Sequence, residues 1–379
     1  MTAMYTRLLH PPKGSFFLLG PRGTGKTTWV HKQFPGAKVF DLLDQGLYQS
    51  YLADVSTFSR ELNSVKPGTW VVIDEIQRLP DLLHEVHRWI ESKKLKFVLT
   101  GSSARKLKKL GTNLLAGRAL HCSMHPFLPE EMGKDFNLDT ALQIGTIPII
   151  VSSDSPQETL EAYVQLYLKE EIQAEALVRN LSGFARFLPI SALFHGQVMN
   201  ISTLARDAGV ARTTVNGYLS ILEDTLVGVR LPAYESSLRV REKCHPKFYW
   251  FDPGVVRALK KARGPVAQDE SGSLLEGFVL GMLRAIKSYT NAFDDIFYWS
   301  PAEAKLTEVD FLLTRGTEKI AIEVKSSLRI REEHFRGLRA IEGLKGLKKR
   351  ILVYPGTRRQ KTSDGIEIIP ISELGQDLL

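Results

Sequence analysis

The segment from Ser15 to Thr28 constrains the fold of this chain more than any other stretch. It reads SFFLLGPRGTGKTT, in which a short apolar run is followed at Gly20 by the pattern G-x-x-x-x-G-K-[ST]. Glycines let backbone N–H groups wrap around phosphate oxygens, and the helix that follows adds its positive dipole end. The segment therefore predicts a strand, a phosphate-binding loop (the P-loop) and a helix, typical of a parallel α/β sheet that binds a nucleotide.

The expected ligand of this loop is ATP or ADP with Mg²⁺. The Lys26 ammonium would reach the β- and γ-phosphates, and the Thr27 hydroxyl would ligate Mg²⁺. The residues expected to line the nucleotide are Gly20, Pro21, Arg22, Gly23, Thr24, Gly25, Lys26, Thr27 and Thr28.

A second apolar run, 70–73 (WVVI), reads as a strand buried on both faces and ends in two acids. Asp74 is placed to hold Mg²⁺ through water, and Glu75 to orient or deprotonate the attacking water. Two adjacent acids after such a strand favour hydrolysis of ATP over binding alone. The alternative is a strand that ends in acids by coincidence.

A third strand, 96–100 (KFVLT), ends in hydroxyl-bearing residues. Thr100 and Ser102 could contact the γ-phosphate or the attacking water, with helix N-capping by Ser102 or Ser103 as the alternative. A helix is expected to about residue 115. Arg118 follows it, where a ring-forming ATPase presents an arginine to its neighbour's γ-phosphate. An intrachain salt bridge is the alternative for Arg118.

Two histidine patterns are rejected as metal sites. The segment His84-Glu85-Val86-His87 is one residue shorter than the zinc motif H-E-x-x-H. Its histidines are therefore expected on a helix surface. His121 and His125 would lie roughly 13 Å apart on a strand that rises about 3.3 Å per residue, too far to share a metal.

Helical spacing of apolar residues from Pro156 to about Arg179 predicts a helical lid over 151–190, after an ATPase core at 1–150. Arg179 and Arg186 could reach the nucleotide from this lid.

Residues 201–219 (ISTLARDAGVARTTVNGYL) have the pattern of a helix-turn-helix. Ser202 is expected to cap the first helix, Gly209 to make the turn, and Val215 and Leu219 to anchor the second helix. The residues expected to face outward are Arg212, Thr213, Thr214 and Asn216.

The segment 227–251 follows, with Arg239, Arg241 and Lys243 at the expected tip of a wing. A winged helix is therefore predicted over 191–262. DNA contact is the favoured interpretation, and a scaffold for protein contacts is the alternative.

The segment 307–327 (TEVDFLLTRGTEKIAIEVKSS) reads as two alternating strands joined by a turn. Alternation places Glu308 and Asp310 on one face of the first strand, and Glu323 and Lys325 on one face of the second. If the strands pair, Asp310 approaches Glu323, and two such carboxylates would repel each other without a divalent cation. Lys325 would then stabilise developing charge or steer water.

Glu276 interrupts an apolar helix upstream, where an acid is costly without a metal or a partner. The expected metal ligands are therefore Glu276, Asp310 and Glu323, besides Thr27 and Asp74 in the first domain. A helix from Arg331 to about Leu344 and a strand at 350–354 complete an αβββαβ domain over 263–379, similar to a nuclease. The alternative is a Glu323–Lys325 ion pair with no metal.

Charge and composition agree with a soluble protein that contacts nucleic acid. The 379 residues carry a formal charge of +8, concentrated in the stretches 93–109, 230–263 and 329–361. Such stretches can neutralise DNA phosphates, although solvated helix faces are the alternative. No apolar run reaches the length of a membrane span and no signal peptide is evident. Two distant cysteines, Cys122 and Cys244, favour the reducing cytoplasm.

Taken together, these motifs resemble bacterial and archaeal AAA-type ATP-binding proteins whose C-terminal half is a domain of unknown function. The resemblance covers nearly the whole length. It rests on GPRGTGKT, VVIDEIQ, VLTGSSARKL, LAGRA, GTIP, YLKEEI, YLSILEDT and EVDFLL…AIEVKSS. It implies an AAA+ core, a winged-helix middle and a C-terminal domain similar to PD-(D/E)XK nucleases.

The resemblance also supports the nucleotide roles of Lys26, Thr27, Asp74 and Glu75, and more weakly that of Arg118. For Asp310, Glu323 and Lys325 it implies the fold without implying cleavage.

Two functional hypotheses follow. The first is an ATP-hydrolysing protein that acts on DNA as a hexamer-like homo-oligomeric ring, with branched or junction DNA as one candidate substrate. Its C-terminal domain would be nuclease-like, and cleavage by that domain stays open. The second is a slow nucleotide-dependent switch for signalling or transcription, in which that domain is not catalytic.

Overall fold

The computed structural model describes residues 5–103, 115–167, 181–234, 245–301 and 307–378. The chain divides into two compact units. The first is built from Thr6–His125 with the short piece Asp224–Leu226, and the second from Pro126–Glu223 and Val227–Leu379. We describe each unit separately.

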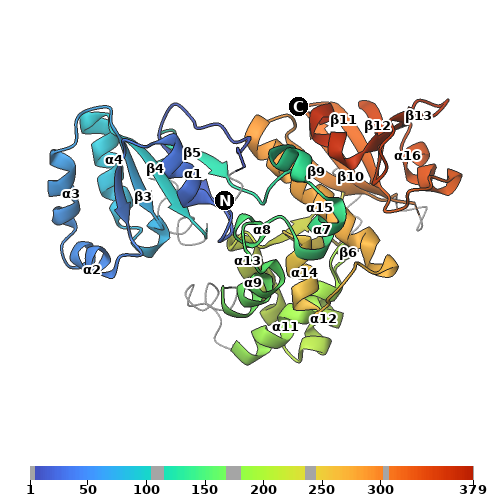
Figure 1. The fold of residues 1–379 in the computed structure, drawn as a ribbon, viewed down its shortest axis with the longest axis horizontal. Helices are drawn as coiled ribbons and strands as arrows, with labels where there is room; N and C mark the ends of the chain where they lie inside the picture. The colour runs from blue at the N-terminus through green and yellow to red at the C-terminus, as the bar shows by residue number, and fades with distance from the viewer. Residues whose placement is uncertain (1–4, 104–114, 168–180, 235–244, 302–306, 379) are drawn as a thin grey trace. The chain divides into compact units, whose positions relative to one another are not determined.

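The N-terminal unit contains a parallel sheet in the order β2-β3-β4-β1-β5, which confirms the predicted parallel α/β sheet. Its strands are β1 (Phe16–Leu19), β2 (Lys38–Asp41), β3 (Trp70–Asp74), β4 (Lys96–Gly101) and β5 (Leu120–Ser123). Its helices are α1 (Lys26–Gln33), α2 (Gln45–Ala53), α3 (Val55–Asn63), η1 (Ile76–Arg78) and α4 (Leu82–Lys93). Figure 1 shows these elements in blue and cyan.

Strand β4 lies between β1 and β3 in this sheet. The central strands β1, β3 and β4 are buried because their apolar residues pack under the helices, with Phe17, Ile73 and Leu99 almost fully inaccessible. Since the strands are parallel, the carboxyl ends of β1, β3 and β4 meet at one edge. This edge carries the predicted nucleotide residues.

The first half of the second unit is mostly helical. Its helices are α6 (Pro129–Met132), η2 (Gly133–Asp135), α7 (Leu138–Ile144), α8 (Pro148–Val151), α9 (Pro156–Ala162), the π-helical turn η3 (Tyr163–Tyr167), α11 (Leu181–Leu193), α12 (Ile201–Ala208), α13 (Arg212–Asp224) and α14 (Pro253–Leu259). An antiparallel sheet in the order β6-β8-β7 is formed by β6 (Gln197–Val198), β8 (Lys247–Trp250) and β7 (Gly228–Leu231).

Helices α12 and α13 form the predicted helix pair. Gly209 ends α12 at φ 64°, and Val215 and Leu219 are fully buried. Arg212, Thr213 and Asn216 are exposed as expected, whereas Thr214 is half-buried.

The predicted cap of α12 was wrong. Ser202 lies inside the helix, and the Asn200 side chain accepts hydrogen bonds from the backbone N–H groups of Ser202 and Thr203. Asn fills this role because its short side chain reaches back to the first turn from an extended backbone.

Other predictions in this half have mixed outcomes. The lid helix is described as far as Tyr167, where it has turned π-helical, and Arg179 lies outside the described residues. Arg186 donates to the backbone oxygen of Ala208 at the end of α12. The wing-tip residues Arg239, Arg241 and Lys243 also lie outside the described residues.

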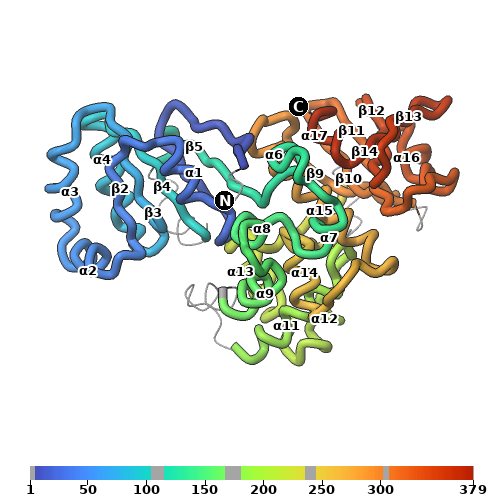
Figure 2. Tube along the Cα trace, viewed as in Figure 1, coloured from blue at the N-terminus to red at the C-terminus, as the bar shows by residue number. Residues whose placement is uncertain are grey.

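The C-terminal part of this unit is a six-stranded sheet in the order β13-β14-β12-β11-β10-β9. Its elements are α15 (Gln268–Thr290), β9 (Asp295–Trp299), β10 (Val309–Arg315), β11 (Glu318–Val324), η4 (Glu332–Phe335), α16 (Arg336–Ala340), β12 (Leu347–Tyr354), β13 (Gln360–Lys361), β14 (Glu367–Pro370), η5 (Ile371–Glu373) and α17 (Leu374–Leu378). Figure 2 shows β10 to β14 grouped in orange and red.

The order from α15 to β12 matches the predicted αβββαβ succession, and two short strands extend it. The helix predicted at 331–344 is shorter and begins with a 3₁₀ turn, η4. Strands β10 and β11 pair antiparallel, as the turn at 315–317 predicts. Within the described ranges, none of the helices is long and apolar enough to cross a membrane.

Candidate functional site

The P-loop follows β1 and runs straight into α1. Gly23 and Gly25 have positive φ angles of 78° and 83°, a region that glycine adopts without a steric penalty. A Cβ atom on Gly20 would lie 2.4 Å from the backbone oxygen of Met124, so this position excludes side chains. The loop therefore presents its backbone closely, as a phosphate cradle requires, and the residues present fit a nucleotide.

Lys26 lies buried inside the loop. Its ammonium donates hydrogen bonds to the backbone oxygens of Gly20 (2.7 Å) and Pro21 (3.1 Å). The Thr24 hydroxyl donates to the Pro21 oxygen at 2.8 Å, which fixes the turn around the ammonium. The Lys26 ammonium is thus held inside the loop by the loop's own backbone oxygens. Arg22 lies in the same loop, and Thr28 is exposed in the first turn of α1.

Hydrogen bonds connect helix α1 with the ends of β3 and β4 at this edge of the sheet. The Thr27 hydroxyl donates to Asp74 Oδ2 at 2.8 Å, and the Thr100 hydroxyl donates to Asp74 Oδ1. The backbone N–H of Glu75 donates to Thr100 Oγ1 at 3.2 Å. A hydroxyl and a carboxylate held together in this way fit the ligand preference of Mg²⁺. The structure thus brings together Thr27, Asp74, Glu75 and Thr100, which the sequence analysis assigned to one site.

Glu75 has an unusual backbone. Its φ and ψ of 58° and 45° lie in the left-handed region, which is uncommon for a residue other than glycine and is concentrated at functional sites. The side chain is buried, and its Oε2 accepts hydrogen bonds from Gln77 Nε2 and from Ser102 Oγ (3.2 Å). The carboxylate therefore has a defined position beside Asp74.

Gln77 is a site residue that the sequence analysis missed. It is buried, and its Nε2 also donates to Ser102 Oγ at 3.0 Å. A Cβ on Gly101 would lie 2.6 Å from Gln77 Oε1, so the glycine leaves room for the amide. The available signal was a polar residue two positions after the acid pair, which periodicity alone does not separate from a surface residue.

Arg118 adopts the alternative that the sequence left open. Its Nε lies 2.5 Å from Glu91 Oε1 of α4, and its side chain is 39% exposed. Hydrogen bonding by Arg118 lowers the pKa of Glu91. The described structure thus shows an intrachain salt bridge, and contact with a neighbouring subunit stays a prediction.

A second cluster of charges lies in the C-terminal part of the second unit. Glu276 of α15 and Glu308 and Asp310 of the β10 segment offer oxygens within 4.8 Å of one another. Asp310 Oδ2 also accepts the backbone N–H of Val324 at 2.8 Å, which ties it to β11. We refer to Glu276, Glu308 and Asp310 as the acidic cluster.

Lys247 of β8 occupies this cluster, a contact that sequence reasoning did not anticipate. Its Nζ lies 3.0 Å from Glu276 Oε1 and 3.9 Å from Asp310 Oδ1, and it also pairs with Glu308. The Lys247 side chain is 4% exposed, and the nearby carboxylates raise its pKa despite burial. The Tyr249 hydroxyl, two residues along the strand, donates to the same Glu276 oxygen.

Glu323 and Lys325 form an ion pair with each other, the other alternative considered from the sequence. Burial and the Asp310 charge raise the pKa of Glu323 above its usual range. Burial and Asp310 likewise raise the pKa of Glu276. Asp310 and Glu323 are close enough to interact, as predicted, but Glu308 takes the place expected for Glu323 in the cluster. Alternation had placed Glu308 on the Asp310 face, so the signal was present.

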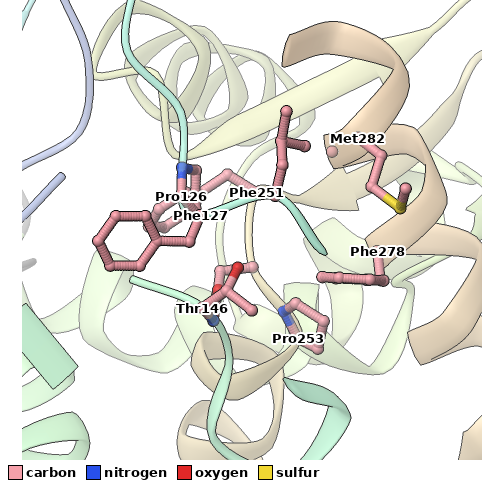
Figure 3. Close-up of a pocket in the computed structure, with 10 residues that line it drawn as sticks. Pro126, Phe127, Thr146, Phe251, Pro253, Phe278 and Met282 are labelled. Carbon is pink, nitrogen blue, oxygen red and sulfur yellow. Dashed lines mark hydrogen bonds between the residues drawn. The ribbon is translucent and has the colours of Figure 1, made fainter. Parts of the chain in front are cut away.

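A small cavity of about 20 Å³ lies elsewhere in the second unit. Figure 3 shows Phe251, Phe278 and Met282 around it, with Thr146 and Pro253 alongside. The adjacent Asp252 is fully buried and accepts the backbone N–H of Thr146 at 2.8 Å. Burial raises the pKa of Asp252 to about 7. This volume holds no more than a water molecule, so the cavity is a packing feature.

Three family models match successive parts of the chain. Residues 13–133 match an AAA domain, residues 135–265 a domain of unknown function (DUF8612), and residues 271–374 another domain of unknown function (DUF4143). Uncharacterized proteins of Mycobacterium tuberculosis and Mycobacterium bovis are each 26% identical over 368 residues, which cover 94% of this chain and 80% of the relative.

Solved structures show weak likeness. The Aeropyrum pernix ORC1 protein in complex with DNA is 14% identical with a TM-score of 0.32, over 66% of this chain and 87% of that one. A replication initiator DnaA bound to AMPPCP and single-stranded DNA is 15% identical with a TM-score of 0.28, over 57% and 83%. At these scores the likeness adds no functional argument. The AAA match and the P-loop geometry together support an AAA-type P-loop ATPase in the first part of the chain.

Proposed function

We propose that the protein hydrolyses ATP at the edge of the N-terminal sheet and couples this reaction to DNA bound by its second unit. The observation that carries the proposal is the hydrogen-bond network that joins Thr27 of α1 with Asp74, Glu75 and Thr100 at the ends of β3 and β4. A hydroxyl–carboxylate pair suited to Mg²⁺ and the adjacent acid Glu75 would serve hydrolysis, whereas nucleotide binding alone does not need the second carboxylate.

The residues have distinct expected roles. The Lys26 ammonium exchanges the carbonyls of Gly20 and Pro21 for phosphate oxygens when ATP enters the loop. Thr27 and Asp74 hold Mg²⁺, which supplies charge neutralisation on the phosphates when bound. Glu75 orients the water and accepts its proton as the water oxygen attacks the γ-phosphorus and the bond to the β-phosphate oxygen breaks.

DNA is the proposed partner because of the second unit's surface. Arg212, Thr213 and Asn216 are exposed at the start of α13, the helix that a helix-turn-helix places in the major groove. The segment 329–361 adds exposed basic residues, among them Arg329, Arg336, Lys345 and Lys348. We further propose that the working form is a ring of identical subunits, in which Arg118 would exchange Glu91 for a neighbour's nucleotide.

The test is a phosphate-release assay on the full-length protein, without DNA and with single-stranded, duplex or four-way-junction DNA. We expect DNA to stimulate turnover, Lys26→Ala and Glu75→Gln to lower it by about 100-fold, and Arg212→Ala to reduce the stimulation alone. Arg60→Ala, an exposed arginine of the N-terminal unit, is the matched control. Turnover indifferent to every DNA form would refute the coupling.

The second hypothesis, a slow nucleotide-dependent switch, has one observation in its favour. Lys247 fills the acidic cluster of the nuclease-like part, which argues for a part that does not cut. Tightly bound ADP in the purified protein, with turnover that is slow and unaffected by Arg118→Ala, would favour the switch over the ring ATPase.

A further inference from the structure

We infer that the Lys247 ammonium replaces the divalent cation of the acidic cluster, so that the cluster is a metal-free clamp that conceals a latent cation site. The inference concerns only the second unit. It does not depend on ATP hydrolysis, so failure of the ATPase proposal would leave it intact.

The first support is position. Lys247 Nζ contacts all three acids of the cluster, with Glu276 Oε1 at 3.0 Å, Asp310 Oδ1 at 3.9 Å and Glu308 as the third partner. The same three acids form the group that could hold a metal among the described residues. A divalent cation would sit about 2.0–2.6 Å from such oxygens, in the space that the ammonium fills.

The second support is rigidity. Lys247 belongs to the central strand β8, where its backbone pairs with Leu231 of β7 and Val198 of β6. The side chain is almost fully buried. A buried ammonium without partners is very costly, so Lys247 cannot leave the carboxylates unless another group replaces them.

The third support is chemistry suited to an ammonium. The Lys247 Nζ lies 5.6 Å from the centre of the Tyr298 ring, a cation–π distance. The Tyr249 hydroxyl donates to Glu276 from the same strand. An aromatic ring favours an organic cation, whereas Mg²⁺ and Mn²⁺ prefer a shell of oxygens. Strand β8 is thereby clamped to α15 and β10.

A rival position for a metal is also present and has to be tested. Glu323 Oε2 is buried and, within the part of the chain that the structure describes, accepts no hydrogen bond. A cation between Glu323 and Asp310 would coexist with Lys247. This rival site would bind a cation while Lys247 is present, whereas the latent site would bind one only after Lys247 is replaced.

The experiment measures Mn²⁺ binding by electron paramagnetic resonance on the full-length, nucleotide-free protein. Every variant carries Thr27→Ala to weaken the cation site of the P-loop. The protein that carries Thr27→Ala alone is the parent. We compare it with variants that also carry Lys247→Met, Asp310→Asn, or both. Tyr249→Phe is the matched control, because it removes a neighbouring hydrogen bond but keeps the ammonium. Circular dichroism checks that each variant folds.

We expect the parent to bind Mn²⁺ no better than its Asp310→Asn form, and Lys247→Met to gain a site at least about tenfold tighter that Asp310→Asn abolishes. Tyr249→Phe should gain none. Asp310-dependent Mn²⁺ binding by the parent would overturn the inference, and this arm decides alone if Lys247→Met does not fold. A folded Lys247→Met protein without added Mn²⁺ binding would overturn it as well.

Discussion

At the residue scale, the candidate ATPase site depends on few side chains with little freedom. Glu75 combines a left-handed backbone with a buried carboxylate, and both features are sustained by neighbours. Thr100 accepts its backbone N–H, while Gln77 and Ser102 donate to its carboxylate. A strained residue persists only when the surrounding structure holds it, so the position of the Glu75 carboxylate depends on these three neighbours. Changes in the neighbours should therefore affect the rate of ATP hydrolysis more than the affinity for the nucleotide.

Gln77 provides the sharpest test of this idea. We expect Gln77→Ala to lower kcat by about tenfold and leave the KM for ATP unchanged, because the hydrogen bonds described for Gln77 go to Glu75 and Ser102. Gln45→Ala, an exposed glutamine at the start of α2, is the control. Steady-state phosphate release measures both constants. A change confined to KM would show that Gln77 acts on nucleotide binding instead.

At the element scale, helix α12 shows how a cap is chosen. Asn200 has the extended backbone of a cap, φ −103° and ψ 98°, and accepts two first-turn N–H groups. Ser202, two residues later, lies in the first turn of the helix, and its backbone N–H donates to the Asn200 side chain. The sequence alone offers both residues as caps, and the choice depends on where the preceding loop enters the helix.

Asn200→Ala should therefore destabilise the second unit by about 1 kcal/mol, the usual cost of losing a side-chain cap. Ser202→Ala should change the free energy of unfolding by only a few tenths, since alanine favours helix interiors. Urea unfolding followed by circular dichroism compares the two variants. Equal losses for both would mean that the Asn200 hydrogen bonds contribute little.

At the scale of the whole molecule, two units with separate cores are expected to unfold in separate steps. Asp252 belongs to the second unit, and its folded pKa of about 7 lies well above the unfolded value. The folded state therefore binds a proton more readily. Its stabilising contribution is complete below the unfolded pKa and is lost as the pH rises toward 7.

We expect the second unit to lose about 1.4 kcal/mol per pH unit from this group between pH 5 and 6.5, and Asp252→Asn to remove that slope. The comparison with the variant is needed because His195, whose pKa burial lowers to about 3, has the opposite dependence. Calorimetry at several pH values resolves the two transitions. If the free energy of unfolding had the same pH dependence in both proteins, a group other than Asp252 would bind the proton.

The sequence by itself determined the parts that depend on local spacing. The P-loop after β1, the acids at the end of β3 and the hydroxyls at the end of β4 converge because the carboxyl ends of parallel strands meet at one edge of the sheet. The α12–α13 pair follows from helical periodicity and one glycine, and the pairing of β10 with β11 follows from alternation around a turn.

Only the tertiary structure decided which distant charges meet. Lys247 reaches the acidic cluster because β8 is packed against α15 and β10, and no spacing rule relates it to Asp310. Gln77 and Arg118 likewise acquire their distant partners Ser102 and Glu91 from the way β4 and α4 are placed beside them. Side-chain contacts between remote segments depend on how whole elements pack, and periodicity in one segment carries no information about the other.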